Sequence, residues 1–268
     1  MKPLRIISPS RAELYRLRNP LERGELKVFE WLDAKLAPAW EIYVQPHLNG
    51  LCPDFVLLHP RAGVIVLEVK DWNLDAISYR MQARKGAAPH LEIQTPAGWK
   101  SHEKNNPVSK LNLYRDEIQT LYCPSLTGVD IYRLVSCAVI FPYALQAAVV
   151  DLLRPSLDYF FDLKTYPMNC TIAGSDDLTT DDLGEILRVA LSTSQSGMTA
   201  TIADELRHWL VEPEYSAEQR QTPELEAKQK DYAETRTPTG FRRIKGAAGS
   251  GKSVVLAARA ARLVAEGK

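Results

Sequence analysis

The sequence predicts an α/β protein, because segments with helical apolar spacing alternate with runs that are typical of buried strands. Apolar residues recur at helical spacing between Leu21 and Leu36. Residues 106–122 also look helical, with Pro107 suited to the first turn. Residues 52–72 contain two apolar strands joined by a short turn, and residues 132–141 form a further buried strand. This alternation of helix and strand is typical of the α/β class.

The composition is that of an ordinary globular protein of 268 residues, 45% hydrophobic and 25% charged. That length is enough for one large domain or two modest ones. Lys+Arg and Asp+Glu are equal at 33 each, so any basic surface that binds nucleic acid has to be local.

Targeting and redox signals are absent from the sequence. Cys52, Cys123, Cys137 and Cys170 include no CxxC pair, so we expect small buried side chains rather than zinc ligands or disulfides. The segment MKPLRIISPSRAELY lacks the apolar core of a signal peptide, and no apolar run approaches the length of a membrane span. We therefore expect a cytoplasmic protein without a membrane partner.

Several further elements are predicted from local patterns. Strands are expected at WEIYVQ (40–45), AISYR (76–80) and HLEIQT (90–95), and helices over 144–153, over 176–191 from near Thr180, and over 199–211. A basic, polar region surrounds the two short strands. Its cations are Arg80, Arg84, Lys85, Lys100 and Lys104, which either follow a nucleic-acid backbone or belong to a solvated loop.

The composition becomes polar after residue 211. Residues 212–240 contain several Pro and Gly residues and few apolar positions, so we expect a linker with one polar helix. The predicted domains are therefore residues 1–211, a linker over 212–240, and a separate C-terminal segment over 241–268.

The C-terminal segment contains GAAGSGKS (246–253), which fits the P-loop pattern G-x-x-x-x-G-K-[ST] between a predicted strand, FRRIK, and a predicted helix. Gly246, Gly249 and Gly251 would let backbone N–H groups turn toward phosphate oxygens. Lys252 would reach the outer phosphates of ATP, and Ser253 would hold Mg²⁺. About fifteen residues follow the motif, too few for an ATPase core, so we expect a fragment of a longer protein.

The apolar hairpin carries charged residues that its strands do not need. If residues 59–63 form the loop, Asp54 faces Glu68 across the pair, and Phe55 faces Leu67. Lys70 shares the face of Glu68 because strand side chains alternate with period two.

Two opposed carboxylates destabilise a strand pair unless a cation lies between them. Asp54 and Glu68 are therefore predicted ligands of Mg²⁺ or Mn²⁺. Lys70 would orient a water or stabilise developing negative charge. Glu25, on the inward stripe of the first helix, would be a further ligand or hold one.

Two structural explanations of the same residues remain open. Asp54 would cap the strand, and Glu68 and Lys70 would form an ion pair on an exposed edge. A slip of one residue would also place Asp54 opposite Val69 and separate the carboxylates.

Three segments together resemble the nuclease-related domain, NERD. They are GELKVFEWL (24–32), DFVLLHPRAGVIVLEVKDW (54–72) and NNPVSKLNLY (105–114), within a resemblance that covers roughly residues 18–145. The family is similar to the PD-(D/E)xK nucleases. The resemblance implies a central mixed sheet flanked by helices and metal-dependent cleavage of phosphodiester bonds. The matching positions are Glu25, Asp54, Glu68 and Lys70.

The chain departs from this family on one helix. Members often carry a glutamine followed four residues later by a tyrosine, and here Lys110 and Tyr114 stand in that place. The role of the helix is therefore left open, with Lys110 a candidate to contact a phosphate.

The C-terminal segment resembles the opening of superfamily one helicases of the UvrD/Rep kind, which often follow NERD in one chain. The resemblance implies that Gln229, about seventeen residues before Gly246, reads the adenine of ATP. The surrounding AKQKDY matches that motif poorly.

The predicted function is metal-dependent cleavage of DNA by the N-terminal part of a nuclease–helicase, in DNA processing, repair or defence against foreign DNA. One alternative is an inactive module that positions DNA for an ATP-driven motor, and another is a P-loop switch. DNA is favoured over RNA as the partner, the rest of the helicase is expected in cis, and a homo-oligomer is left open.

Overall fold

The computed structural model describes most of the chain, in ranges separated by gaps. The described residues are 5–17, 19–48, 50–121, 123–166, 169–179, 183, 187, 197–211, 225–235, 243–245 and 251–266. Contacts between Cα atoms divide the chain into two units, residues 1–212 and residues 213–268.

The larger unit is built on a six-stranded mixed sheet with the strand order β1-β2-β3-β4-β8-β9. The pairs β2–β3 and β3–β4 are antiparallel, whereas β1–β2, β4–β8 and β8–β9 are parallel. The strands span Ile7–Ser8 (β1), Glu41–Val44 (β2), Phe55–His59 (β3), Gly63–Val69 (β4), Val135–Ile140 (β8) and Cys170–Ala173 (β9). β4 is paired on both sides and buried along its whole length, so it lies at the centre of the sheet.

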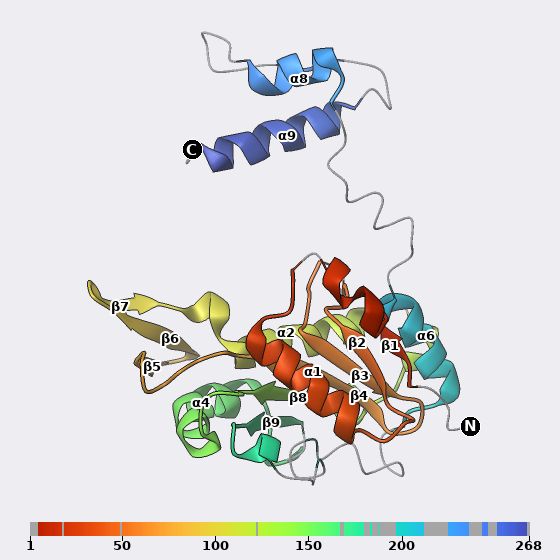
Figure 1. Cartoon of the computed structure of the whole chain (residues 1–268), viewed down its shortest axis with the longest axis vertical. Coiled ribbons are helices and arrows are strands. Elements are labelled where there is room, and N and C mark those ends of the chain that lie inside the picture. Colours follow the sequence, from red (N-terminus) through yellow and green to blue (C-terminus); the bar gives the residue numbers. More distant parts are fainter. Residues whose placement is uncertain are drawn as a thin grey trace. The chain divides into compact units, whose positions relative to one another are not determined.

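Helices cover both faces of this sheet (Figure 1). Alternate residues of β4 divide between two apolar cores, as period-two alternation requires: Ile65 and Leu67 pack with α1 (Arg23–Lys35), and Val64 and Val66 pack on the other face. The helices of that other face are α2 (Pro107–Thr120), α4 (Gln146–Phe160) and α6 (Ala200–Leu210). The mixed sheet flanked by helices is therefore present.

The predicted helices begin where their capping residues stand. Asn106 accepts hydrogen bonds from the N–H groups of Val108 and Ser109, and Pro107 occupies the first turn of α2, as predicted. Thr199 accepts a hydrogen bond from Ile202 N at the start of α6. The predicted helix over 144–153 is confirmed but continues to Phe160, with Pro155 inside it.

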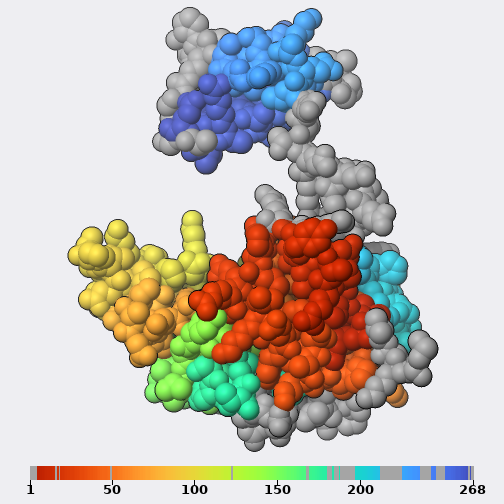
Figure 2. Space-filling model, viewed as in Figure 1, coloured from red at the N-terminus to blue at the C-terminus, as the bar shows by residue number. Residues whose placement is uncertain are grey.

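A second, three-stranded antiparallel sheet stands beside α4 and projects to one side of the larger unit (Figure 2). Its strands are β5 (Tyr79–Arg84), β6 (Ala87–Thr95) and β7 (Gly98–Ser101). The strand predicted over 90–95 is confirmed within β6, whereas the one predicted over 76–80 is shifted along the chain, because residues 74–76 form a turn and β5 begins only at Tyr79. The third strand corrects the sequence-based view of a polar loop, because Gly98–Ser101 pairs with residues 92–95 of β6.

Three other elements differ from the predictions. The strand predicted over 132–141 begins only at Val135, because Asp130 caps a short helix, α3 (Ile131–Leu134), through the N–H of Tyr132. β1 and β9 were not predicted, since each is two to four residues long and gains its hydrogen bonds from a neighbour far along the chain.

The smaller unit contains two described helices, α8 (Ala227–Glu234) and α9 (Lys252–Ala265). They pack together, and Arg259 donates hydrogen bonds to the carbonyl oxygens of Tyr232 and Thr235. The helix predicted to follow the Gly-rich segment is confirmed as α9. Residues 243–245 form no strand, contrary to the prediction for FRRIK, because no described strand of this unit pairs with them.

Some predictions fall outside the described residues. These are the helix over 176–191, of which only the 3₁₀ turn Asp177–Thr179 and two single residues are described, and the P-loop glycines Gly246 and Gly249. None of the four cysteines, all of them among the described residues, forms a disulfide; three are buried as expected, and Cys52 is half-buried. Across the described ranges, no helix has both the length and the apolar character needed to cross a bilayer.

Candidate active site

The hairpin pairs in the predicted register. Phe55 faces Leu67 and Leu58 faces Val64, although His59 also pairs with Gly63 and so shortens the loop to three residues. Asp54 directly precedes β3, and its Oδ2 accepts a hydrogen bond of 2.6 Å from Val69 N. Asp54 therefore does cap the strand pair, and the same bond holds its carboxylate at the end of β4 beside Glu68.

Glu68 is buried in the centre of the sheet, with 1% of its surface exposed. Its Oε1 accepts hydrogen bonds from Lys70 Nζ at 2.6 Å and from Lys110 Nζ at 2.9 Å. Its Oε2 is buried and has no hydrogen-bond partner among the described residues. The Glu68–Lys70 ion pair exists, but it lies on the central strand and not on an exposed edge.

Asp54 and Glu68 repel one another. Burial raises the pKa of Asp54 well above its ordinary value, and the Glu68 carboxylate raises it further, against the Lys70 ammonium and the hydrogen bond from Val69. Burial alone would lower the pKa of Lys70, but Glu68 and Asp54 outweigh it and raise that pKa. The site thus places two carboxylates side by side in a buried setting, and their mutual repulsion adds to the cost of burying them.

The oxygen donors fit a hard divalent cation. Mg²⁺ and Mn²⁺ take carboxylate oxygens, and Oε2 of Glu68 is a buried acceptor that receives no hydrogen bond of ordinary geometry from the described residues, although the Tyr114 hydroxyl lies near this carboxylate. Within the described ranges, no cluster of three or more His, Cys, Asp or Glu side chains is already arranged around a single point. Asp54 and Glu68 therefore offer two protein ligands, and the remaining positions would belong to water or substrate.

Glu25 reaches the same site from the opposite face of the sheet. It lies in the first turn of α1, where its Oε2 accepts a hydrogen bond of 2.8 Å from Glu22 N. Burial raises the pKa of Glu25, while hydrogen bonds from the Glu22 backbone and the Asp54 side chain oppose that shift. The structure thus brings together all four residues predicted from the hairpin and the first helix.

Asp71 holds the start of α1 in this position. Its Oδ2 accepts a hydrogen bond of 3.0 Å from Gly24 N, next to Glu25 in the chain. A Cβ on residue 24 would lie 1.7 Å from Asp71 Oδ1, so only glycine fits. Nothing in the sequence pattern indicates this contact of Asp71, which directly follows Lys70.

α2 contributes two further polar groups. Lys110 donates to Glu68, and Tyr114 donates from its hydroxyl to the carbonyl oxygen of Cys52 at 3.4 Å. Burial first, and then the charges of Glu68 and Asp54, raise the pKa of Tyr114 above its ordinary value. The helix whose role the family departure left open therefore faces the carboxylates. Its signal in the sequence was the (i, i+4) spacing of the two polar groups on one helix face.

Trp72 belongs to the core and not to an open stacking surface. Only 7% of it is exposed, and its ring stacks on Tyr79 with the centroids 4.4 Å apart. His102 lies against both rings. Burial, and second the Lys70 ammonium, lower the pKa of His102. His102 directly follows β7, so this end of the second sheet lies near Lys70.

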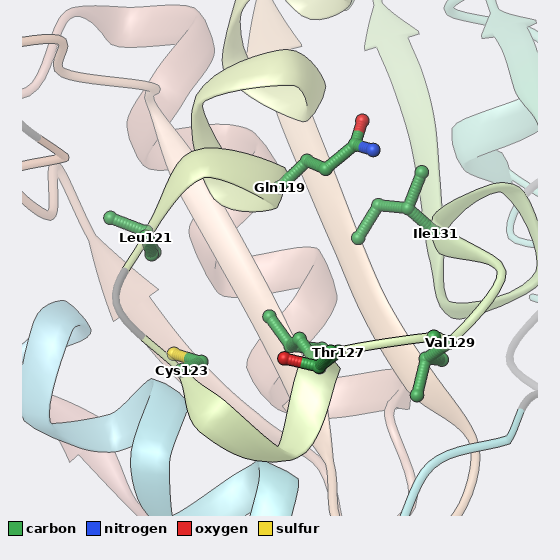
Figure 3. A pocket seen from close by; sticks show the side chains of 8 residues that line it. Gln119, Leu121, Cys123, Thr127, Val129 and Ile131 are labelled. Atoms are coloured by element: carbon green, nitrogen blue, oxygen red, sulfur yellow. The ribbon is translucent and has the colours of Figure 1, made fainter.

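A pocket lies elsewhere, between the C-terminal end of α2 and the loop that leads to α3 (Figure 3). Its volume is about 280 Å³, and its lining residues are Gln119, Leu121, Cys123, Leu126, Thr127, Gly128, Val129 and Ile131. The lining contains no carboxylate and no cation, so it offers none of the chemistry found around Glu68.

In the smaller unit, Gly251 adopts φ = 75°, a left-handed conformation that favours glycine, directly before α9 begins at Lys252. A Cβ on residue 251 would lie 2.5 Å from Nε2 of Gln229. The structure therefore places Gln229 beside Gly251, while Ser253 stands in the first turn of α9.

Residues 21–142 match the family model of the nuclease-related domain, NERD. No curated protein and no solved structure matched the chain. The match covers β2, β3, β4, the second sheet, α1, α2 and β8, together with Glu25, Asp54, Glu68 and Lys70. The segment from residue 21 to residue 142 is therefore a nuclease-related domain.

Proposed function

We propose that the larger unit cleaves phosphodiester bonds of DNA with the help of Mg²⁺ or Mn²⁺, and that Asp54 and Glu68 hold the cation. One observation carries the proposal: Glu68 is 1% exposed, yet its Oε2 has no hydrogen-bond partner among the described residues and lies beside a second carboxylate. A buried carboxylate oxygen without a partner beside a second carboxylate destabilises the fold on its own. A cation bound between the two groups would remove that cost, which would explain why both are present.

The roles of the side chains follow from their positions. A divalent cation at Asp54 and Glu68 would polarise a phosphate oxygen and acidify a water molecule. Lys70, held at 2.6 Å from Glu68, is placed to orient the attacking water or to stabilise charge on the phosphate. Lys110 is the more exposed of the two lysines, with 32% of its side chain accessible, so it is placed to meet a phosphate arriving from solvent.

Glu25 keeps the Asp54 carboxyl in place from the side of α1. Burial is the main cause that raises the pKa of both carboxyl groups, which lie close enough to affect one another. Deprotonation of Asp54 would then accompany cation binding, with Glu25 as a further ligand through water or as the group that orients Asp54.

A plasmid-nicking assay tests this proposal. Supercoiled DNA is incubated with the purified chain in Mg²⁺, in Mn²⁺ and in EDTA, beside Asp54→Asn and Lys70→Met. We expect nicking with either cation, none in EDTA, and a loss of at least about 100-fold in both variants. Nicking by Asp54→Asn at the rate of the unaltered chain, with both proteins folded, would refute the assignment.

The alternative is a module that has kept the fold and binds DNA without cutting it. It predicts salt-sensitive binding that is the same in EDTA and in Mn²⁺, with no nicking by any variant. The buried, unpartnered Glu68 oxygen favours the nuclease, because a module that needs no cation gains nothing from it.

We also propose that the smaller unit begins a nucleotide-binding helicase domain, in a complete protein that processes DNA in repair or in defence against foreign DNA. The position of Gln229 beside Gly251 supports it, because the side chain predicted to read adenine adjoins the phosphate-binding segment. Lys252 and Ser253 would then contact ATP and Mg²⁺. A fluorescent ATP analogue should bind the complete protein, and its affinity for the Lys252→Ala variant of that protein should be at least about tenfold lower. Equal affinity for the two proteins would reject the nucleotide-binding proposal.

A further inference from the structure

The second sheet is the local basic surface of the larger unit. Residues 79–105 carry five basic and two acidic side chains, a net charge of +3 in a chain whose net charge is zero. The basic residues are Arg80, Arg84, Lys85, Lys100 and Lys104, and the acidic ones are Glu92 and Glu103. The imbalance is large enough to attract an anionic partner to this side of the molecule.

Both acidic side chains are engaged within the fold. Glu92 accepts from Arg80 Nε at 2.6 Å. Glu103 accepts from Leu91 N at 2.8 Å and from the Asn106 side chain at 3.0 Å. The four remaining cations are exposed and have no ion-pair partner within the described residues; they are Arg84, Lys85, Lys100 and Lys104.

The framework beneath these cations is ordered. The Arg80 guanidinium lies over the Trp99 ring at 4.3 Å, and Leu91 is fully buried against the main core. Ser156 of α4 donates to Met81 on β5. The basic residues therefore lie on or next to a sheet that packs against the domain.

The basic residues extend from beside the proposed active site to the far end of the second sheet. Lys100 faces Ile93, which faces Tyr79, and Tyr79 stacks on Trp72 two residues after Lys70. Lys104 follows His102, whose pKa is lowered by burial and by Lys70. Arg84 stands five residues further along β5, about 17 Å at the usual strand rise. That span corresponds to about five phosphates of one DNA strand.

The surface lacks what recognition of single strands requires. Proteins that bind single strands offer aromatic faces on which bases stack. No large hydrophobic side chain in residues 79–105 is exposed, and Arg80 already covers one face of Trp99. Positive charge without a stacking surface fits the phosphate backbone of a duplex.

We propose that residues 79–105 are a docking surface for the phosphate backbone of double-stranded DNA, which leads the duplex to Glu68 and Lys110. Lys100 and Lys104 contact phosphates near the site, and Arg84 and Lys85 contact phosphates farther along the same duplex. This inference rests on the proposed function, since it names the substrate of that site. Binding is expected to be independent of sequence, because it uses no base edges.

Fluorescence anisotropy with a labelled duplex of mixed sequence tests the proposal on the full chain. EDTA keeps DNA cleavage from contributing to the signal. Arg84→Gln/Lys85→Gln removes two cations, and Arg133→Gln/Lys164→Gln removes two exposed cations from outside the second sheet. We expect the first pair to weaken binding about tenfold and to reduce the slope of log affinity against log salt by about two, while the control stays within about twofold.

Two further arms identify the partner. A single strand of the same sequence should bind the unaltered chain several-fold more weakly than the duplex, and polyglutamate at equal charge should not displace the duplex. Equal binding of the single strand, or displacement by polyglutamate, would overturn the assignment to duplex DNA.

The outcomes separate this inference from the nuclease proposal. If the Arg84/Lys85 variant binds DNA as the control does, the docking surface is wrong, whether or not the chain nicks plasmid. If that variant loses DNA binding and the unaltered chain never nicks plasmid, the docking surface stands and the nuclease proposal fails.

Discussion

Two ammonium groups share one carboxylate oxygen at the centre of the site. Lys70 and Lys110 both donate to Oε1 of Glu68, but Lys110 comes from α2 and is the more exposed. A family member with glutamine at this position would have a neutral donor there. Lys110 therefore supplies a positive charge that the usual pattern lacks, on the side from which a phosphate would arrive.

Substitution of Lys110 should separate chemistry from cation binding. In Lys110→Met we expect the nicking rate to fall about 100-fold, because one donor to the reacting phosphate is lost. Mn²⁺ affinity should not fall, because the Glu68 carboxylate loses a competing ammonium. Lys110→Arg should restore part of the rate, and Lys164→Met, on an exposed turn, is the control. If Lys110→Met lowers the nicking rate and the Mn²⁺ affinity together, Lys110 maintains the structure of the site and does not act on the phosphate.

Asp54 should make the cation-free protein less stable as pH rises. Its folded pKa lies well above the ordinary 3.8, so the folded state holds this proton more tightly than the unfolded chain. The free energy of unfolding therefore falls as pH rises from about 4 through the folded pKa. Asp54→Asn removes that loss and keeps an acceptor for Val69 N.

Thermal unfolding in EDTA measures the effect. At pH 8 the unfolding temperature of Asp54→Asn should exceed that of the unaltered chain, by about 2–4 °C for each kcal/mol of difference in stability. At pH 5 the two unfolding temperatures should lie closer together. A variant that is less stable at pH 8 would mean that the carboxylate is stabilising without a cation.

At the level of elements, the site depends on how α1 begins. Gly24 donates to Asp71 and leaves no room for a Cβ, and the next residue, Glu25, meets Asp54. Glycine in a helix usually costs about 0.5–1 kcal/mol relative to alanine. Its presence here is therefore explained by the contact and not by helix propensity.

Gly24→Ala is expected to reverse the usual sign of a glycine-to-alanine change in a helix. The new methyl group has to push α1 away from Asp71. The free energy of unfolding should therefore fall by about 1–3 kcal/mol, and the unfolding midpoint should fall with it. Nicking should fall with it as Glu25 leaves Asp54. Glu30→Ala, exposed on the same helix, should stay within about 0.5 kcal/mol. A midpoint raised by Gly24→Ala would reject the contact.

The sequence predicts the hairpin and its register because alternation and a short loop leave few arrangements. It cannot predict contacts that need the assembled layers: Lys110 reaches Glu68 over 42 residues, and Gly24 reaches Asp71 over 47. The strand at Gly98–Ser101 escaped prediction because its four residues have little strand propensity of their own and gain their pairing from β6.

At the level of the whole molecule, the larger unit extends beyond the nuclease-related segment. α4, β9 and α6 follow residue 142 and complete the core on the face of Glu68. Arg207 of α6 forms an ion pair at 2.5 Å with the buried Glu41 of β2, which also accepts from the Tyr43 hydroxyl. Without α6, Glu41 would be a buried charge with no cation beside it.

A chain cut after residue 142 is therefore expected not to fold cooperatively. It would lose buried side chains of α4 and α6 such as Val149, Leu153, Ile202 and Leu206, each worth about 1.5–3 kcal/mol. Their sum approaches the 5–15 kcal/mol of a whole domain. Urea unfolding of residues 1–142 and of residues 1–211 compares the two. A cooperative transition of equal midpoint in the shorter chain would contradict this view of the domain.

The central claim is that Asp54 and Glu68 bind a divalent cation, and calorimetric titration with Mn²⁺ tests it most directly. The unaltered chain and Asp151→Asn, which changes an exposed carboxylate on α4, should each show one binding event with the same affinity. Asp54→Asn should bind at least about tenfold more weakly, because one of two carboxylate ligands is lost. Equal binding of Mn²⁺ by Asp54→Asn and the unaltered chain would contradict the account, and the carboxylates would then be parts of the fold alone.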